Sequence, residues 1–351
     1  MKVKNMNFKS DNTVPVNPEI INAISASNHG YQASYGADEY SLKLQKRLSD
    51  IFEKDVLVYL TNTGTAANSL ALSALVKPYE LIFCSSQAHI YTDECGAPEF
   101  YAGGAKMMPI ESLNGKIDLD PINEQIQVSL SLRPHGQKPG CVSLTQATEA
   151  GTVYTIRELE EISEFCKKQS LPIHMDGARF ANSLVHLQCR PADITWKAGV
   201  DVMSFGATKN GALCAEAILF FNHKYAENFD YLHKRSGQLM SKSRFFACQF
   251  LSYLEEDLWL KNAQNANQKA QELAQVFRKH DIEIVHEVQA NEVFVKLSPE
   301  CYEYLQKKGC GFYEWGASTS DLCRFVTSWV TSKSDIEQVD ACLAEYSDDT
   351  R

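Results

Sequence analysis

Short apolar runs alternate with helical patterns through the first two-thirds of the chain. Apolar runs of strand length occupy 55–60, 81–84, 106–110, 140–144, 172–175, 200–205 and 216–222. Segments with helical spacing lie between them, for example at 66–76 and 157–169. The second of these places its acids first and its lysines last, the order that a helix dipole favours. Such alternation predicts a mostly parallel sheet that is covered by helices.

The pattern changes near residue 246. Residues 246–280 have mainly helical spacing with a break near Asp257, and 282–288 and 293–297 have the pattern of strands. A helix over 299–308, a strand over 324–327 and a last helix from Ser334 follow. We therefore expect an α/β protein with an N-terminal arm of residues 1–17, a large domain of residues 18–245 and a smaller α+β domain of residues 246–351.

The composition is that of an ordinary soluble globular protein, with 22% charged and 44% hydrophobic residues. The net charge of −10 argues against nucleic acid or an anionic membrane as a partner, so a small anionic ligand would need a local positive site. Eleven scattered cysteines without a C-x-x-C pair suggest neither zinc nor a thioredoxin-like site, and they fit a reduced, cytoplasmic setting. The first residues lack the apolar stretch of a signal peptide, and no segment approaches membrane-spanning length.

Two short motifs, each directly after an apolar run, carry groups that suit one cofactor. H-M-D-G-A-R at 174–179 contains Asp176, and S-F-G-A-T-K-N-G at 204–211 contains Lys209. Pyridoxal phosphate needs a lysine amine to hold its aldehyde as a Schiff base and a carboxylate to keep its pyridine nitrogen protonated. About one strand–helix–strand unit separates the two residues, so neighbouring strand ends can present both. Alone, Asp176 is more typical of a helix N-cap and Lys209 of a solvated surface, so the signal lies in the pair.

The turn N-T-G-T-A-A-N at 62–68 joins a strand to a helix. Gly64 allows close approach of the backbone, Thr63 and Thr65 add hydroxyl donors, and the free N–H groups at a helix start attract phosphate. By itself the turn is typical of an ordinary N-capped helix. Beside the Lys and Asp pair, phosphate anchoring is the better interpretation.

Three further residues suit such a site. His89 follows a strand-like run, where its imidazole can lie flat on a pyridine ring and reach a substrate hydroxyl. The alternative is a structural His that is hydrogen-bonded by Asp93 or Glu94. Arg179 and Arg324 can clamp an amino-acid carboxylate with paired hydrogen bonds, although surface ion pairing is the default for any single Arg.

Ten motifs together point to one family: F-K-S-D-N, Y-G-A-D, N-T-G-T-A-A-N, A-H-I-Y-T-D-E-C-G-A-P-E, T-Q-A-T-E-A-G-T-V-Y, H-M-D-G-A-R-F-A-N, W-K-A-G-V-D-V, S-F-G-A-T-K-N-G, G-Q-L-M-S-K-S-R-F and R-F-V-T-S-W. The sequence resembles, nearly from end to end, the low-specificity L-threonine aldolases, within the β-eliminating lyase group of fold-type I pyridoxal-phosphate enzymes. The resemblance implies a transferase-like large domain of fold type I with a mostly parallel sheet, followed by the smaller C-terminal domain.

The resemblance also implies a role for each candidate residue. Lys209 is the Schiff-base lysine with Thr208 beside it, Asp176 is the partner of the pyridine nitrogen, His89 stacks on the ring, and Thr63, Gly64 and Thr65 bind the phosphate. Ser10, Arg179 and Arg324 hold the substrate carboxylate, and Arg179 also belongs to the cofactor-binding set. Fold-type I sites form between two subunits, so Tyr35 and the basic pair Lys242 and Arg244 are expected to act on a neighbour's cofactor in a homodimer or homotetramer.

The reaction that the resemblance implies is retro-aldol cleavage of L-threonine, L-allo-threonine and related β-hydroxy-α-amino acids to glycine and an aldehyde. His89, or a water that it positions, is the favoured base. Many relatives carry a His in the loop where this chain has residues 145–149, and no role of that His is carried over. A β-eliminating lyase, a racemase or a transaminase would use the same lysine and aspartate, and a non-catalytic pyridoxal-phosphate-binding protein or assembly partner is a further alternative.

Overall fold

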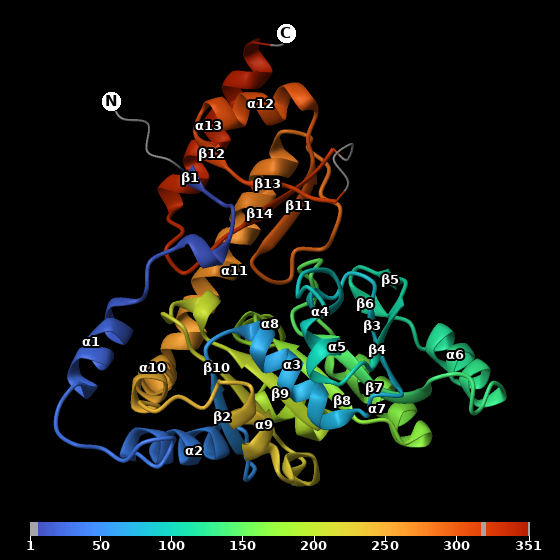
Figure 1. Cartoon of the computed structure of the whole chain (residues 1–351). Coiled ribbons are helices and arrows are strands. Elements are labelled where there is room, and N and C mark those ends of the chain that lie inside the picture. The colour runs from blue at the N-terminus through green and yellow to red at the C-terminus, as the bar shows by residue number, and fades with distance from the viewer. Residues whose placement is uncertain (1–5, 317–320, 350–351) are drawn as a thin grey trace.

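The computed structural model describes residues 6–316 and 321–349. Residues 1–5 of the expected arm, and residues 317–320 and 350–351 of the expected small domain, lie outside the described residues. Figure 1 shows a wide lower part, in which helices surround a central sheet, and a smaller upper part that contains both β1 and α13. Among the described residues, no helix is both long and apolar enough to cross a lipid bilayer.

In the described part of the chain, the central sheet has seven strands in the order β2-β10-β9-β8-β7-β3-β4. Their bounds are β2 (Leu57–Thr61), β3 (Glu80–Ser85), β4 (Lys106–Ile110), β7 (Lys138–Thr145), β8 (Ile173–Gly177), β9 (Val202–Gly206) and β10 (Glu216–Phe220). β10 is antiparallel to both of its neighbours, β2 and β9, whereas the pairs from β9 to β4 are parallel. The prediction of a mostly parallel sheet is confirmed.

Helices cover both faces of this sheet. Along β10, Ala217 and Leu219 pack into one hydrophobic cluster, whereas Ile218 and Phe220 pack into another. Because successive side chains of a strand point to opposite faces, this alternation shows that both faces are buried. The helices of the lower part are α1 (Pro18–Ser27), α2 (Glu39–Ile51), α3 (Gly64–Leu75), α4 (His89–Thr92), α5 (Ala97–Tyr101), α6 (Leu119–Ser131), α7 (Ile156–Gln169), α8 (Phe180–Leu187) and α9 (Phe229–Arg235). Two short strands, β5 (Ser112–Leu113) and β6 (Lys116–Ile117), form a separate hairpin.

The helical segment predicted over 246–280 is confirmed, with its break. α10 (Arg244–Leu254) and α11 (Leu258–Lys279) are separated at Glu256 and Asp257, whose φ values of 46° and 57° a continuing right-handed helix does not accept. The upper part continues with β11 (Glu292–Lys296), α12 (Pro299–Lys307), β12 (Cys310–Gly311), β13 (Tyr313–Glu314), β14 (Leu322–Val326) and α13 (Lys333–Asp349). β14 lies between β11 and β13 and is antiparallel to both.

The strand predicted over 282–288 is wrong except for one isolated bridge between Ile284 and Val295. The N–H of Val285 still donates to the carbonyl of Phe294 in β11, whereas the ring of His286 forms a 3.0 Å hydrogen bond with Oδ1 of Asn114, between β5 and β6. A tertiary contact with the lower part therefore overrides the alternating pattern of this segment.

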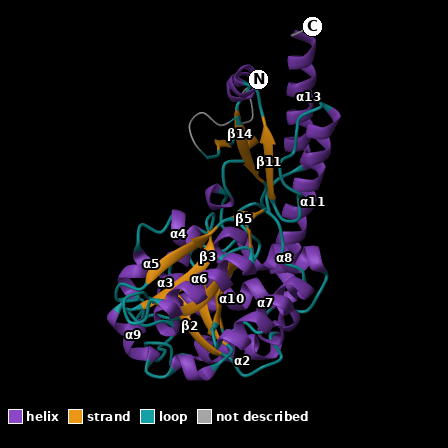
Figure 2. Ribbon diagram, turned by 90° about the vertical axis from the view of Figure 1, so that its right-hand side faces the viewer, coloured by secondary structure: helices purple, strands orange, loops and turns teal. Residues whose placement is uncertain are grey.

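The apolar clusters of the two parts meet along α11. Trp259 and Ala263 of this helix belong to a cluster of the sheet, whereas Ala270 and Phe277 belong to the cluster of the upper part. α10 also packs on the lower part, against α1 and α2. Figure 2 shows α11 running from the sheet layers into the upper part beside α13. We therefore propose two domains whose boundary lies within α11, later than the residue 246 expected from the sequence.

The N-terminal segment belongs to the upper part by its packing. β1 (Met6–Asn7) pairs in parallel with β12, and the side chains of Met6 and Phe8 lie in the hydrophobic cluster of that part. The backbone N–H of Val326 in β14 donates to the carbonyl of Phe8 at 2.8 Å. These contacts bring Ser10 and the residues after it to the junction between the two parts.

Candidate active site

A cavity of about 580 Å³ lies where the carboxyl ends of the parallel strands face the upper part. Of the residues predicted for the site, the following line it: Ser10, Thr63, Gly64, Thr65, His89, Asp176, Arg179, Thr208, Lys209 and Arg324. Ligands of open α/β sheets bind in this position, outside the carboxyl ends of the strands. The cavity therefore brings together most of the groups that the sequence singled out.

Asp176 is fixed near the end of β8. Only 4% of the residue is exposed, and its two carboxylate oxygens accept hydrogen bonds from the N–H of Ala178 at 2.9 Å and from Nδ2 of Asn68 at 2.8 Å. A Cβ on the next residue, Gly177, would lie 2.6 Å from the carbonyl oxygen of Ser204 in β9. The absence of a side chain at Gly177 therefore lets β8 lie close to β9, the strand that leads to Lys209.

Lys209 lies on a short 3₁₀ turn, Thr208–Asn210, directly after β9. Nδ2 of Asn210 donates to the Tyr253 hydroxyl and to the Trp259 carbonyl, both at 2.8 Å, and Asn262 donates to the carbonyl of Asn210. These buried bonds hold the turn from the side opposite the cavity. The lysine amine is consequently presented from a fixed backbone.

The carboxylic acid of Glu216 lies near this lysine at the start of β10. Burial raises the pKa of Glu216 to about 7, although contacts with Thr208 and the positive charge of Lys209 oppose the rise. Glu216 also lines the cavity.

The first turn of α3 faces the cavity with open space in front of it. The hydroxyl of Thr63 caps the helix by accepting from the N–H of Ala66 at 3.1 Å. A Cβ built on Gly64 would meet nothing within 4 Å. The N–H groups of a first helical turn have no acceptor within the helix, so an anion can bind here.

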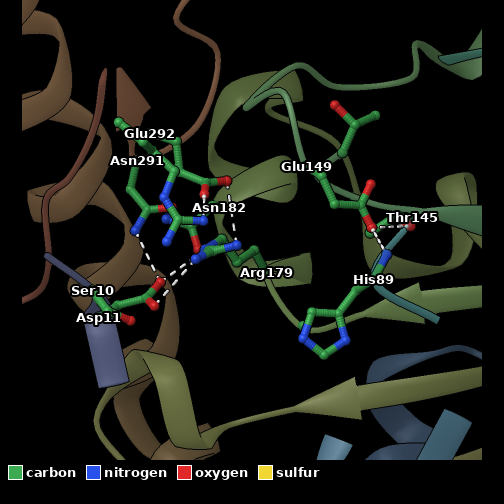
Figure 3. Close-up of polar contacts among 12 residues, drawn as sticks. Ser10, Asp11, His89, Thr145, Glu149, Arg179, Asn182, Asn291 and Glu292 are labelled. Atoms are coloured by element: carbon green, nitrogen blue, oxygen red, sulfur yellow. Dashed lines mark hydrogen bonds and ion pairs between the residues drawn. The ribbon is translucent and has the colours of Figure 1, made fainter. Parts of the chain in front are cut away.

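His89 lies at the start of α4, where it makes the structural contact expected as one alternative and also lines the cavity; its stacking on a pyridine ring stays a prediction. Its Nδ1 lies 2.9 Å from Oε1 of Glu94, which is the structural contact, yet 41% of its side chain is exposed and the ring lines the cavity. The hydrogen bond with Glu94 raises the pKa of His89; burial and the charge of Lys209 oppose this rise, whereas Asp176 adds to it. The backbone N–H of His89 donates to Oε1 of Glu149 at 2.8 Å (Figure 3).

Arg179 makes buried ion pairs inside the cavity, in place of the surface pairing that is the default for an arginine. Its Nε and one terminal nitrogen donate to the two oxygens of Asp11 at 2.8 and 3.2 Å, and its other terminal nitrogen lies 3.2 Å from Glu292 (Figure 3). Burial alone would lower the pKa of Arg179, but the two carboxylates raise it above its ordinary value. Burial also opposes the fall in the pKa of Asp11 that Arg179 and Lys209 produce.

Arg324 reaches the same acid from β14. One of its terminal nitrogens lies 3.6 Å from Glu292, and its guanidinium lies 3.9 Å from the ring centre of Trp315. Burial lowers the pKa of Arg324 below its ordinary value, while Glu292 opposes this. Its Nε is buried and has no hydrogen-bond partner among the described residues, which leaves a donor for a ligand carboxylate.

The sequence reasoning missed four polar residues that orient the predicted groups, Asp11, Asn68, Glu149 and Glu292, whereas Glu94 was one of the two partners expected for His89. Two of them carried a usable signal. Asp11 follows the predicted Ser10, and Asn68 lies four residues after Gly64, on the same face of the helix. The remaining two, Glu149 and Glu292, show their role only through contacts between distant segments.

Tyr35 and Lys242 do not line this cavity. The N–H of Tyr35 donates to the carbonyl of Ser241 at 3.1 Å, so the two predicted residues lie on adjoining loops of the lower part. Tyr35 lines a second hollow of about 290 Å³, and Lys242 is exposed. Their expected action on a neighbouring subunit stays a prediction.

The residues of the cavity fit pyridoxal phosphate. The open space before Gly64 suits a phosphate, the buried Asp176 retains acceptor capacity for a protonated ring nitrogen, and Lys209 supplies the amine. Within residues 6–316 and 321–349, Oδ1 of Asn68, beside Asp176, is buried and has no hydrogen-bond partner.

A mostly parallel sheet whose adjacent strand ends present a lysine and a carboxylate to one cavity defines the fold-type I class of pyridoxal-phosphate enzymes.

A protein-family model described as beta-eliminating lyase matches residues 7–300, and the chain belongs to this family. The chain is 43% identical to a low specificity L-threonine aldolase of Pseudomonas sp. (strain NCIMB 10558), over 97% of this chain and 98% of that protein. It is 44% identical to a protein of the same name from Pseudomonas aeruginosa, over 95% and 94%. A solved threonine aldolase structure from Leishmania major superimposes with a TM-score of 0.91 at 27% identity, over 97% and 98%.

Proposed function

We propose that this chain is a pyridoxal-phosphate-dependent aldolase that cleaves L-threonine, L-allo-threonine and related β-hydroxy-α-amino acids to glycine and an aldehyde. The observation that carries the proposal is the single cavity in which Lys209, Asp176 and His89 meet the arginines of both parts. Because one fold supports many pyridoxal-phosphate reactions, the choice of carbon–carbon cleavage is supported by the near full-length relatives named L-threonine aldolases.

The residues that would hold the cofactor act from three strand ends. Lys209 would bind its aldehyde, the α3 turn at Thr63 to Thr65 would bind its phosphate, and Asp176 would hold the proton on its ring nitrogen. When bound, pyridoxal phosphate supplies an electron sink for the charge that develops at the substrate Cα.

The substrate is oriented by its carboxylate. Arg324 offers the unpartnered Nε as well as its terminal nitrogens, and Ser10 approaches from the N-terminal segment. Arg179 is already paired with two carboxylates, those of Asp11 and Glu292, so we propose that Arg324 provides the larger share of the direct clamp. A carboxylate clamped in this way fixes the rotation of the substrate about Cα, which selects the bond that is cleaved.

His89, or a water that it positions, takes the proton of the β-hydroxyl as the Cα–Cβ bond breaks. Its partly exposed side chain lines the same cavity as Asp176 and Lys209. The proton acceptor, the carboxylate for the ring nitrogen and the lysine amine therefore face one cavity.

Product analysis tests the proposal. The purified protein, supplied with pyridoxal phosphate, is expected to convert both threonine isomers to acetaldehyde and glycine, and borohydride is expected to trap the cofactor on Lys209. Absence of acetaldehyde from both isomers, together with pyruvate from L-serine or L-cysteine, would replace the aldolase with a β-eliminating lyase. Ammonia and keto acid from threonine would point to transamination or another reaction at the Cα–H bond.

We further propose a homodimer, or a tetramer built from dimers, in which Tyr35 and Lys242 serve the neighbouring subunit's cavity. The exposure of Lys242 and the half-exposed ring of Tyr35 support this arrangement. Sedimentation of the active protein at micromolar concentration is expected to show no monomer. A reduced, cytoplasmic location also stays a proposal; it is supported by eleven cysteines that are all free thiols.

A further inference from the structure

A buried chain of polar contacts joins His89 to Asp176 through two residues that the proposed mechanism does not use. Nδ1 of His89 lies 2.9 Å from Oε1 of Glu94, and the same oxygen accepts from Nδ2 of Asn68 at 2.8 Å. The other hydrogen of that amide group points to Oδ2 of Asp176, also at 2.8 Å. The side-chain amide of Asn68 therefore bridges two carboxylates: that of Glu94, which contacts His89, and that of Asp176, which would face the ring nitrogen of the cofactor.

The contacts determine which histidine nitrogen carries a proton. The side chain of Glu94 is fully buried, and its second oxygen, Oε2, has no hydrogen-bond partner in the part of the chain that the structure describes. A buried carboxylate is stable only where donors satisfy it, and the imidazole is one of the two donors that reach it. Nδ1 of His89 is therefore the donor, and in the neutral ring the lone pair lies on Nε2.

The orientation of the ring follows from the same contact. With Nδ1 held against the buried acid, Nε2 is directed to the side of the ring that lies in the cavity, and it has no hydrogen-bond partner among the described residues. The backbone of His89 is fixed as well, because its N–H donates to Glu149. Both the ring and its main chain are thus held by carboxylates of separate segments.

We propose that Glu94 is a positioning residue, which holds the Nδ1 proton and the ring orientation of His89 so that Nε2 accepts the β-hydroxyl proton. This inference rests on the proposed aldolase function, since it names the group that prepares its base. Asn68 completes the arrangement by holding Glu94 and Asp176 at a fixed separation.

The charged groups around the ring support this role. Glu94 lies behind it, Asp176 and Lys209 lie in the cavity, and Glu149 lies at its backbone. The hydrogen bond with Glu94 raises the pKa of His89. The charge of Asp176 adds to this rise, and the charge of Lys209 opposes it. Glu94→Gln removes the largest favourable contribution, and the amide can also donate to Nδ1, which would move the ring proton to Nε2.

Hydrogen–deuterium exchange at the histidine ring carbon, followed by mass spectrometry, measures the pKa of His89 without reference to activity. In Glu94→Gln we expect this pKa to fall by about 1 unit or more, as loss of an adjacent opposite charge predicts. Asp93→Asn is the matched control, because it removes a neighbouring carboxylate that accepts from the Thr92 hydroxyl, whereas the His89 ring bonds to Glu94. We expect a smaller shift there. An unchanged His89 pKa in folded Glu94→Gln would overturn the proposal.

The pH profile of kcat/KM gives the second readout. The acid limb of the wild-type profile is expected to follow the His89 pKa, and in Glu94→Gln it should move to lower pH by the same amount, with kcat reduced about 10-fold or more. Cofactor absorbance should remain. Glu94→Asp keeps the charge and should restore part of kcat, and it replaces the Gln variant if that chain does not fold. An acid limb that stays in place while the His89 pKa falls would also overturn the proposal.

Failure of the aldolase function is recognised separately, by a wild type that forms no acetaldehyde while the exchange experiment still reports on Glu94.

Discussion

Two Arg–Asp pairs in this chain have nearly the same geometry and opposite exposure, so they allow a direct test of what burial contributes. Arg179 donates to Asp11 at 2.8 Å from Nε and 3.2 Å from a terminal nitrogen. Arg190 donates to Asp193 at 3.1 and 2.9 Å from the same atom types. The side chains are 11% and 2% exposed in the first pair, but 64% and 23% exposed in the second.

Asp11→Asn is expected to destabilise the folded chain by about 3 kcal/mol. Removal of one partner from a buried ion pair costs about 3–5 kcal/mol, because the other charge stays buried. The lower end applies here, since Glu292 still lies 3.2 Å from Arg179. Asp193→Asn is the matched control and should leave stability nearly unchanged, because water screens an exposed pair.

Thermal unfolding measures the difference. In a chain of this size, each kcal/mol of lost stability lowers the melting temperature by about 2 °C, so Asp11→Asn should lower it by about 6 °C. Both variants are compared with the wild type at one saturating concentration of pyridoxal phosphate, because ligand binding itself raises the melting temperature. The reasoning is refuted if the two variants melt within 1–2 °C of each other, on the same scale of about 2 °C per kcal/mol.

The pH dependence of this difference has a definite sign. Arg179 and Lys209 hold the pKa of Asp11 below its ordinary value of 3.8 although burial opposes this. A carboxyl group with a depressed folded pKa contributes stability above its unfolded pKa and loses it as the pH falls through the folded pKa. The gap between wild type and Asp11→Asn should therefore be complete above about pH 4 and shrink in stronger acid.

Three further outcomes follow from the site. Asp176→Asn should still bind pyridoxal phosphate, measured by absorbance, while turnover falls about 10²–10³-fold because the charge that keeps the ring nitrogen protonated is lost; near-normal turnover would contradict this role. Arg324→Lys should raise the KM for L-threonine and Arg324→Ala should raise it further, since one ammonium cannot reproduce a bidentate clamp, and an equal KM in all three proteins would exclude Arg324 as the clamp. Burial raises the pKa of Glu149 from 4.5 to about 7, so the wild type should lose stability as the pH rises through this range. The melting temperature of Glu149→Gln should depend less on pH there, and parallel plots of melting temperature against pH for the two proteins would contradict the role of Glu149.

The sequence predicted those site residues whose position follows from the strand that precedes them. Asp176 and Lys209 come directly after apolar runs, and parallel strands present their carboxyl ends at one edge, so their meeting could be predicted without knowledge of the packing. The same logic placed the α3 turn and His89.

The partners of Arg179 could not be predicted in this way. Arg179 pairs with Asp11, far earlier in the chain, and with Glu292, far later, and neither local pattern contains a sign of the other. The packing of α10 on α1 and α2 likewise depends on the full tertiary structure, and it is the reason that we propose a later domain boundary than the sequence predicts. The spacing of apolar residues predicts one helix or strand at a time, whereas these ion pairs and helix contacts each join two separate elements.

The parallel pairing of β1 with β12 imposes an order of events on a newly made chain. Met6 pairs with Cys310, so about 300 residues must be synthesised between the two partners. At about 5–20 residues per second, ribosomal synthesis keeps the N-terminal strand without its partner for about 15–60 s. Throughout this interval the cluster that receives Met6 and Phe8 is incomplete, because Cys310, Phe312 and Phe325 belong to it, and the contacts that bring Ser10 and Asp11 to the cavity are incomplete as well. The sheet with Lys209 can be complete on the ribosome while the carboxylate-binding side of the cavity is still absent, so the nascent chain gains its cofactor site before its substrate site.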